Sequence, residues 1–139
     1  EVLYEPETAR LAPGQCEVWP FARGRGGERI DLRHIPGPEA HAHDDVILGD
    51  LRRGFAAVTN PRLGLRFGLE WDEHLFRYVG LWQPFGGADA PPLTGIYGLG
   101  VEPWTSRYNL AVAVEHGEAI ALAPGEARRT ILRARIDPC

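Results

Sequence analysis

Nine residues near the middle of the chain alternate between apolar side chains and polar or glycine positions. Leu63, Leu65, Phe67, Leu69 and Trp71 occupy every second position, with glycine, arginine and glutamate between them. Successive side chains of a β-strand point to opposite faces, so this period of two predicts a strand with one buried face. An amphipathic helix would need apolar residues three or four positions apart. Residues 63–71 are therefore expected to form a half-buried strand.

Other segments with strand character are short and bounded by Gly, Pro or Asn. Residues 72–76 should form a turn, and residues 109–115 fit either a strand or a short helix. We expect strands or extended segments at 16–19, 28–32, 55–59, 119–122 and 128–136, and two further strands within 78–106. Many short strands separated by turn signals predict an all-β fold, either an antiparallel sandwich or a barrel.

Composition narrows the class of protein. A chain of 139 residues that is 44% hydrophobic and 24% charged is long enough for one domain with a real core, so we assign residues 1–139 to a single domain. No apolar run is long enough to cross a bilayer and no N-terminal signal pattern occurs, which predicts a soluble, cytoplasmic protein without a membrane partner. A net charge of -4 with scattered signs argues against nucleic acid as a partner.

The sequence contains neither lysine nor methionine. All fifteen basic residues are arginine, so Schiff-base chemistry, a pyridoxal phosphate anchor and a P-loop, which need lysine, are excluded. Methionine is absent even at position 1, so we expect a processed product or a piece of a longer chain. Cys16 and Cys139 lie near opposite ends without C-x-x-C spacing and are interpreted as unpaired thiols.

The stretch from Tyr78 to Ser106 carries the strongest functional signal. In its second strand, Gly98, Gly100 and Glu102 share one face, which leaves a floor almost free of side chains with one carboxylate on it. Glycine within a strand often marks close approach of a ligand or another backbone. Trp82 and Trp104 stand beside this floor, and flat apolar rings of this kind stack on sugars. The pattern indicates a carbohydrate site.

Several motifs occur in the order and spacing typical of one protein family. They are Tyr4-Glu5-Pro6, the Thr8–Gly14 segment, Trp19-Pro20, Leu81-Trp82-Gln83, Tyr97–Thr105 with its Glu-Pro-Trp-Thr sequence, and the Leu122–Glu126 turn. Together they resemble the C-terminal part of the aldose 1-epimerase (galactose mutarotase-like) family. The resemblance implies an antiparallel β-sandwich that corresponds to the C-terminal half of the mutarotase supersandwich, with the N-terminal portion of the family lying before residue 1.

The resemblance also implies a function and a set of residues. The family interconverts the anomers of an aldose by general acid/base catalysis and needs neither a cofactor nor a metal. Glu102 takes the place of the general base, and His43 beside Asp44 matches a His-Asp pair of the family. The expected substrate-binding residues are Trp82, Gln83, Trp104 and Arg66. Gln83 has the opposite strand parity to Trp82, and an ion pair with Glu70 is the alternative for Arg66.

Two other classes of function fit part of the sequence. The family's general acid typically comes from a His-Pro segment that this chain lacks, which favours a non-catalytic carbohydrate-binding protein. The His41-x-His43 spacing is also typical of a metal-dependent cupin-like barrel, with Asp45 or Asp50 as the carboxylate, although no histidine follows the Pro124-Gly125 turn. A small-molecule sugar is the expected partner, and exposed sheet edges suggest a possible homo-oligomer.

Overall fold

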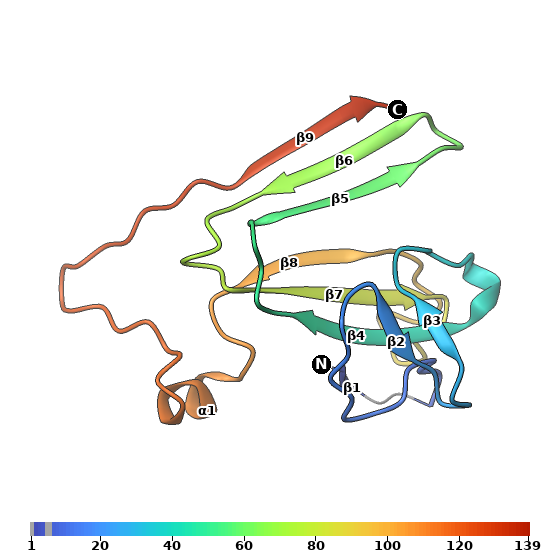
Figure 1. Cartoon of the computed structure of the whole chain (residues 1–139), viewed down its shortest axis with the longest axis horizontal. Helices are drawn as coiled ribbons and strands as arrows, with labels where there is room; N and C mark the ends of the chain where they lie inside the picture. Colours follow the sequence, from blue (N-terminus) through green and yellow to red (C-terminus); the bar gives the residue numbers. More distant parts are fainter. Residues whose placement is uncertain (1, 5–6) are drawn as a thin grey trace. The chain divides into compact units, whose positions relative to one another are not determined.

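The regular secondary structure of the protein is mainly antiparallel β-strand, which confirms the predicted all-β class (Figure 1). The computed structural model describes residues 2–4 and 7–139, so Glu5 and Pro6 of the first motif lie outside the described residues. The strands are β1 Val2–Tyr4, β2 Phe21–Arg23, β3 Arg29–Asp31, β4 Ala42–Leu48, β5 Phe55–Asn60, β6 Leu65–Glu70, β7 Tyr78–Phe85, β8 Gly100–Trp104 and β9 Arg133–Pro138. One short α-helix, α1 Leu110–Glu115, and one 3-10 turn, η1 Pro38–Ala40, complete the described elements.

The chain forms two compact units, each made of two separate stretches of sequence. The first unit contains the residues up to Leu48 together with Gly80–Glu102, and the second contains Gly49–Val79 together with Pro103–Cys139. The assignment of residues 1–139 to a single mutarotase-like domain stays a prediction. Among the described residues, no helix has the length and apolar character that a bilayer-spanning helix requires.

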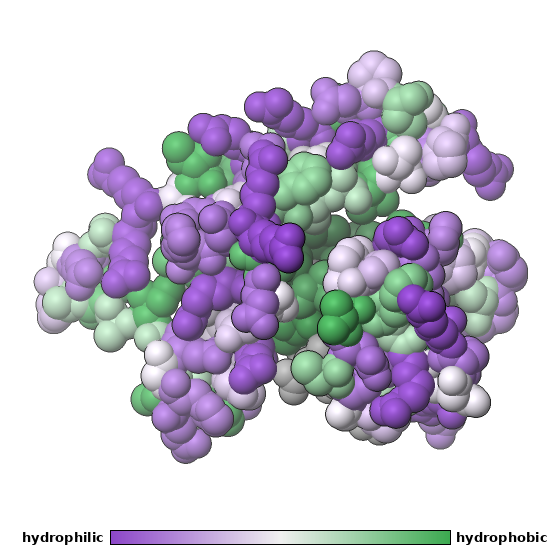
Figure 2. All heavy atoms as spheres, in the orientation of Figure 1, coloured by the Kyte–Doolittle hydropathy of each residue, from purple (hydrophilic) through white to green (hydrophobic). Residues whose placement is uncertain are grey.

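The first unit consists of a four-stranded sheet, in the order β1-β4-β7-β8, and the hairpin β2-β3. Alternation along β4 sends Val46 to one face of the sheet, where it is buried with Ala22 of the hairpin and Leu11. Ile30, Leu32, Leu48 and Leu81 pack against this cluster. The core of the unit therefore lies between the hairpin and one face of the sheet, while hydrophilic residues dominate the outer side of the hairpin (Figure 2).

The second unit contains the three-stranded sheet β5-β6-β9. Phe67 of β6 lies opposite Val58 on one neighbour and Ile136 on the other. Leu69 and Trp71 are buried, as the alternating pattern predicts, but Leu65 and Phe67 remain more than one-third exposed. The turn at 72–76 is confirmed, because the amide of Phe76 donates to the carbonyl of Asp72.

Three expected strands differ from the structure. Residues 16–19 and 119–122 lie outside the described strands, and β9 begins only at Arg133, where pairing with Glu70 starts. Extended backbone becomes a strand only where a neighbouring strand accepts its hydrogen bonds, and these segments have no such partner. Residues 109–115 form a helix, because the Asn109 side chain accepts a hydrogen bond from the amide of Val112 and caps its first turn.

Candidate functional site

A histidine and a tryptophan meet on the face of the sheet that lies opposite the core of the first unit. The indole Nε1 of Trp82 on β7 donates a 2.9 Å hydrogen bond to Nε2 of His43 on β4. This contact makes Nε2 an acceptor, so in the neutral imidazole the proton is on Nδ1. The two rings meet edge to face, with centroids 6.2 Å apart. The orientation of the Trp82 ring is therefore set by a specific polar contact as well as by packing.

The glycine floor predicted on β8 is present at Gly100. A methyl group placed on Gly100 would lie 2.8 Å from Oε1 of Glu102 and 3.1 Å from Cβ of Trp82. Glu102 and Trp82 therefore flank the same open patch of backbone, and only glycine leaves both side chains in place. Strand β8 begins only at Gly100, so Gly98, which was expected on the same strand, precedes it, and an added methyl group there would contact nothing within 4 Å.

Asp45, which the sequence suggested only as a possible metal-binding carboxylate, lies on the same face as His43. It lies two residues after His43 on β4, so both side chains project from the same face. Burial raises the pKa of the Asp45 carboxyl above its usual value, and the negative charges of Glu102 and Asp44 raise it further, while His43 opposes the shift. A carboxyl group whose environment favours the protonated form can act as a proton donor.

The arrangement provides the elements of acid/base chemistry on one surface. Glu102 and Asp45 are carboxyl groups close enough for the charge of one to affect the pKa of the other. Pairs of titratable groups in different environments are a common basis for assigning an acid and a base. His43 lies beside Asp45 along the strand, and Trp82 adds an aromatic ring. The face therefore carries groups that can donate and accept protons, together with an aromatic ring.

Two residues of the matched motifs lie on the core side of the sheet. His43 and Asp44 are adjacent on β4, so their side chains point to opposite faces. The Asp44 carboxylate is fully buried and accepts hydrogen bonds from Arg10 and Leu11. The Gln83 side chain is buried on the same side, with Oε1 accepting a 3.1 Å bond from Arg10 Nη2, so it faces away from the candidate site.

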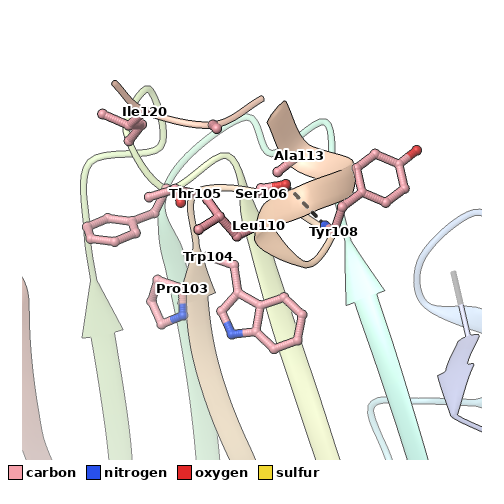
Figure 3. Close-up of a pocket in the computed structure, with 10 residues that line it drawn as sticks. Pro103, Trp104, Thr105, Ser106, Tyr108, Leu110, Ala113 and Ile120 are labelled. Atoms are coloured by element: carbon pink, nitrogen blue, oxygen red, sulfur yellow. Dashed lines mark hydrogen bonds between the residues drawn. The ribbon is translucent and has the colours of Figure 1, made fainter. Parts of the chain in front are cut away.

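Trp104 and Arg66 belong to the second unit. Trp104 lines a cavity of about 470 Å³ whose walls are mostly apolar, and Figure 3 shows its ring beside Pro103, with Leu110 and Ala113 of the α1 region near it. Arg66 is exposed on β6, and the carboxylate of Glu70 that could have paired with it is bound by Arg53 at 2.8 Å. The substrate-binding roles expected for Trp104 and Arg66 stay predictions.

The metal-binding alternative loses its geometric basis. His41 ends the 3-10 turn η1 in a left-handed conformation, with φ of 44°, and β4 begins only at the next residue. The two imidazoles of His41 and His43 therefore do not alternate along one strand as a cupin-like site requires. Within residues 2–4 and 7–139, no three His, Cys, Asp or Glu side chains are grouped to hold a metal ion.

Known proteins add nothing to this assignment of the site. No protein-family model, curated protein or solved structure matches the chain. The role of the cluster must therefore be argued from its own chemistry.

Proposed function

We propose that this protein binds an aldose and interconverts its anomers by general acid/base catalysis. The observation that carries the proposal is the placement of Asp45, Glu102, His43 and Trp82 on one face of the β4-β7-β8 sheet, around the bare backbone of Gly100. An aromatic ring beside carboxylates suits a sugar, which has apolar ring faces and polar hydroxyl edges. The resemblance of the Glu102 segment to the aldose 1-epimerase family supports the same reaction.

The proposed reaction needs one base and one acid. Glu102 removes the proton from the anomeric hydroxyl while a second group gives a proton to the ring oxygen, so the bond between C1 and the ring oxygen breaks and an open-chain aldehyde forms. Rotation about the C1–C2 bond and reversal of both proton transfers close the ring with the opposite configuration.

The acid has two candidates. His43 is the residue expected from the sequence, and it can donate only through Nδ1 because Nε2 accepts from Trp82. Asp45 is the second candidate, because burial raises the pKa of its carboxyl group above the usual value, which favours the protonated form. The variants Asp45→Asn and His43→Gln separate these roles, since only the acid's replacement should lower the rate of anomer interconversion about 100-fold or more.

The direct test follows the equilibration of freshly dissolved α-glucose or α-galactose by NMR with and without the protein. We expect acceleration that Glu102→Gln abolishes, and the exposed Glu17→Gln provides a matched control that should retain the full rate. Sugar binding without acceleration would identify a non-catalytic carbohydrate-binding protein instead. The proposal would be refuted if the protein neither bound nor accelerated the equilibration of any aldose tested.

The proposal includes a small-molecule sugar as partner, a cytoplasmic location, no role for nucleic acid or a membrane, and a homo-oligomer. Strands β5 and β9 form the edges of their sheet, which supports self-association because unpaired edge groups can accept another chain. Light scattering coupled to size-exclusion chromatography measures the molar mass directly. A single monomeric species at high protein concentration would count against the homo-oligomer.

A further inference from the structure

Behind the candidate site, on the core side of the same sheet, an arginine links the two strands that carry His43 and Trp82. Arg10 donates through Nε to Oδ2 of Asp44 at 2.6 Å and through Nη2 to Oε1 of Gln83 at 3.1 Å. Asp44 follows His43 on β4, and Gln83 follows Trp82 on β7. Each strand therefore contributes one residue to the hydrogen bond on the site face and the next residue to the arginine link on the opposite face.

The segment that supplies Arg10 also holds the backbone of β4. The amides of Arg10 and Leu11 donate to Oδ1 of Asp44 at 2.9 and 3.0 Å. One residue earlier on the strand, the amide of His43 donates to the carbonyl of Thr8 at 3.2 Å. The Thr8–Leu11 segment is thus bonded both to the backbone of His43 and to the side chain that follows it.

This polar link is difficult to explain by stability alone. Gln83 is 3% exposed, and its Nε2 has no hydrogen-bond partner among the residues that the structure describes. Exchanging the positions of Oε1 and Nε2 in the Gln83 side-chain amide would not satisfy Nε2, because Nε2 would then face the donor Nη2 of Arg10. Buried ion pairs are weak evidence for stability, and their best-supported use is to fix the register of neighbouring elements. An apolar residue at position 83 would avoid the unpaired donor altogether.

We propose that Arg10, Asp44 and Gln83 are positioning residues that hold β4 and β7 in the register required for the hydrogen bond between Trp82 and His43. This inference rests on the proposed function for its catalytic consequence, but its geometric content can be tested without any sugar. The cluster acts through the backbone of two strands, since its side chains project from the face opposite the site.

The primary readout is the indole N–H resonance of Trp82 in a ¹⁵N-labelled sample of the full chain. The protein has four tryptophans, so Trp82→Phe identifies the signal by its loss. In Gln83→Leu and Arg10→Lys we expect the Trp82 signal to move toward the position of a solvent-bonded indole and its exchange with water to accelerate at least 10-fold. Arg10→Lys keeps the charge but not the planar fork that reaches two acceptors, so charge alone should not restore the signal.

Gln83→Leu separates positioning from simple structural support. The variant removes the unpaired buried donor and also the acceptor of Arg10 Nη2, but the Arg10 side chain is 21% exposed and can donate to water instead, so the melting temperature should change little while the Trp82 resonance shifts. The matched controls are Asp31→Asn and Arg33→Gln, which break an exposed ion pair on the hairpin of the same unit and should leave the Trp82 signal in place. Asp44→Asn is the more severe variant, and its interpretation requires a folded spectrum.

The outcomes distinguish this inference from the proposed function. An unchanged Trp82 resonance and exchange rate in folded Gln83→Leu and Arg10→Lys would overturn the positioning role. If the wild type accelerates anomer interconversion, the same two variants should lower kcat at least 5-fold with a smaller effect on KM, because the site is displaced rather than removed. If the wild type has no such activity while the resonance shifts as expected, the proposed function fails and the positioning role stands.

Discussion

Gly98 and Gly100 form a matched pair for testing the site on β8. Gly98 lies two residues before Gly100, the first residue of β8, and an added methyl group would meet nothing within 4 Å at Gly98 but two site residues at Gly100. Neither glycine has a positive φ that alanine would resist. The substitutions Gly98→Ala and Gly100→Ala therefore differ mainly in what the new methyl group contacts.

The expected magnitudes follow from these contacts. Replacing glycine by alanine restricts the unfolded chain, so Gly98→Ala should stabilise the protein by about 0.5 kcal/mol. Gly100→Ala gains the same amount but forces the methyl group against Cβ of Trp82 at 3.1 Å, and overpacking of this kind costs about 1 kcal/mol or more. The two variants should therefore differ by about 1 kcal/mol, or about 4 °C in melting temperature for a chain of this size.

The effect on activity should exceed the effect on stability. Oε1 of Glu102 lies 2.8 Å from the position of the new methyl group, so the carboxylate must swing away from the open floor. Displacing a catalytic group by about 1 Å can cost about 100-fold in rate, and this is the loss expected for Gly100→Ala in the anomer-equilibration assay, against none for Gly98→Ala. Equal rates and equal melting temperatures for the two variants would show that the Gly100 floor does not shape the site.

Three further predictions concern charge and capping. The pKa of Asp45 is raised above 3.8 in the folded state, so the contribution of its protonated form to stability is present at pH 3 and is lost as the pH rises through the folded pKa. Asp45→Asn should therefore raise the melting temperature more at pH 7 than at pH 3. The Arg33 side chain lowers the pKa of Asp31 to about 2, so the contribution of this pair is present above pH 3.8 and is lost as the pH falls through about 2; Asp31→Asn should reduce the difference in melting temperature between pH 5 and pH 2, and an unchanged difference would contradict the assignment. Asn109→Ala removes the acceptor for the amide of Val112 and should lower the free energy of unfolding by about 1 kcal/mol, while Asn109→Asp should retain most of the stability in the same denaturant titration.

Strands with long or regular patterns could be predicted from the sequence, and short paired segments could not. The alternation around Phe67 correctly indicated β6, because a period of two has one simple structural explanation. Strands β2 and β3 have only three residues each, too few for a period to be recognised, and only the latter fell within a predicted segment. The choice of a helix for 109–115 depended on Asn109 as a cap, a signal that the sequence contained and the apolar pattern obscured.

The candidate site likewise contains features that could be predicted from the sequence and others that could not. Glu102 and Gly100 could be predicted to share a face because they lie two residues apart on one strand, where alternation alone fixes the face of each residue. Strand parity also relates Asp45 to His43, two residues earlier on β4, but the sequence suggested only a metal-binding role for Asp45, because its burial and its proximity to Glu102 depend on the fold. The bond between Arg10 and Asp44 joins residues 34 positions apart, and no local pattern in a single sequence predicts such a contact.

The interleaving of the two compact units limits how the chain can be divided. The two stretches of each unit flank one stretch of the other, so the polypeptide passes between the units at 48–49, 79–80 and 102–103. Strands β7 and β8 each contribute residues to both units. A gene cut at 79–80 would divide both units, whereas a cut at 48–49 or 102–103 would leave one unit whole and divide the other. Exchange of one unit between proteins would require all three junctions at once, so duplication, loss and inheritance should act on the pair as a single module.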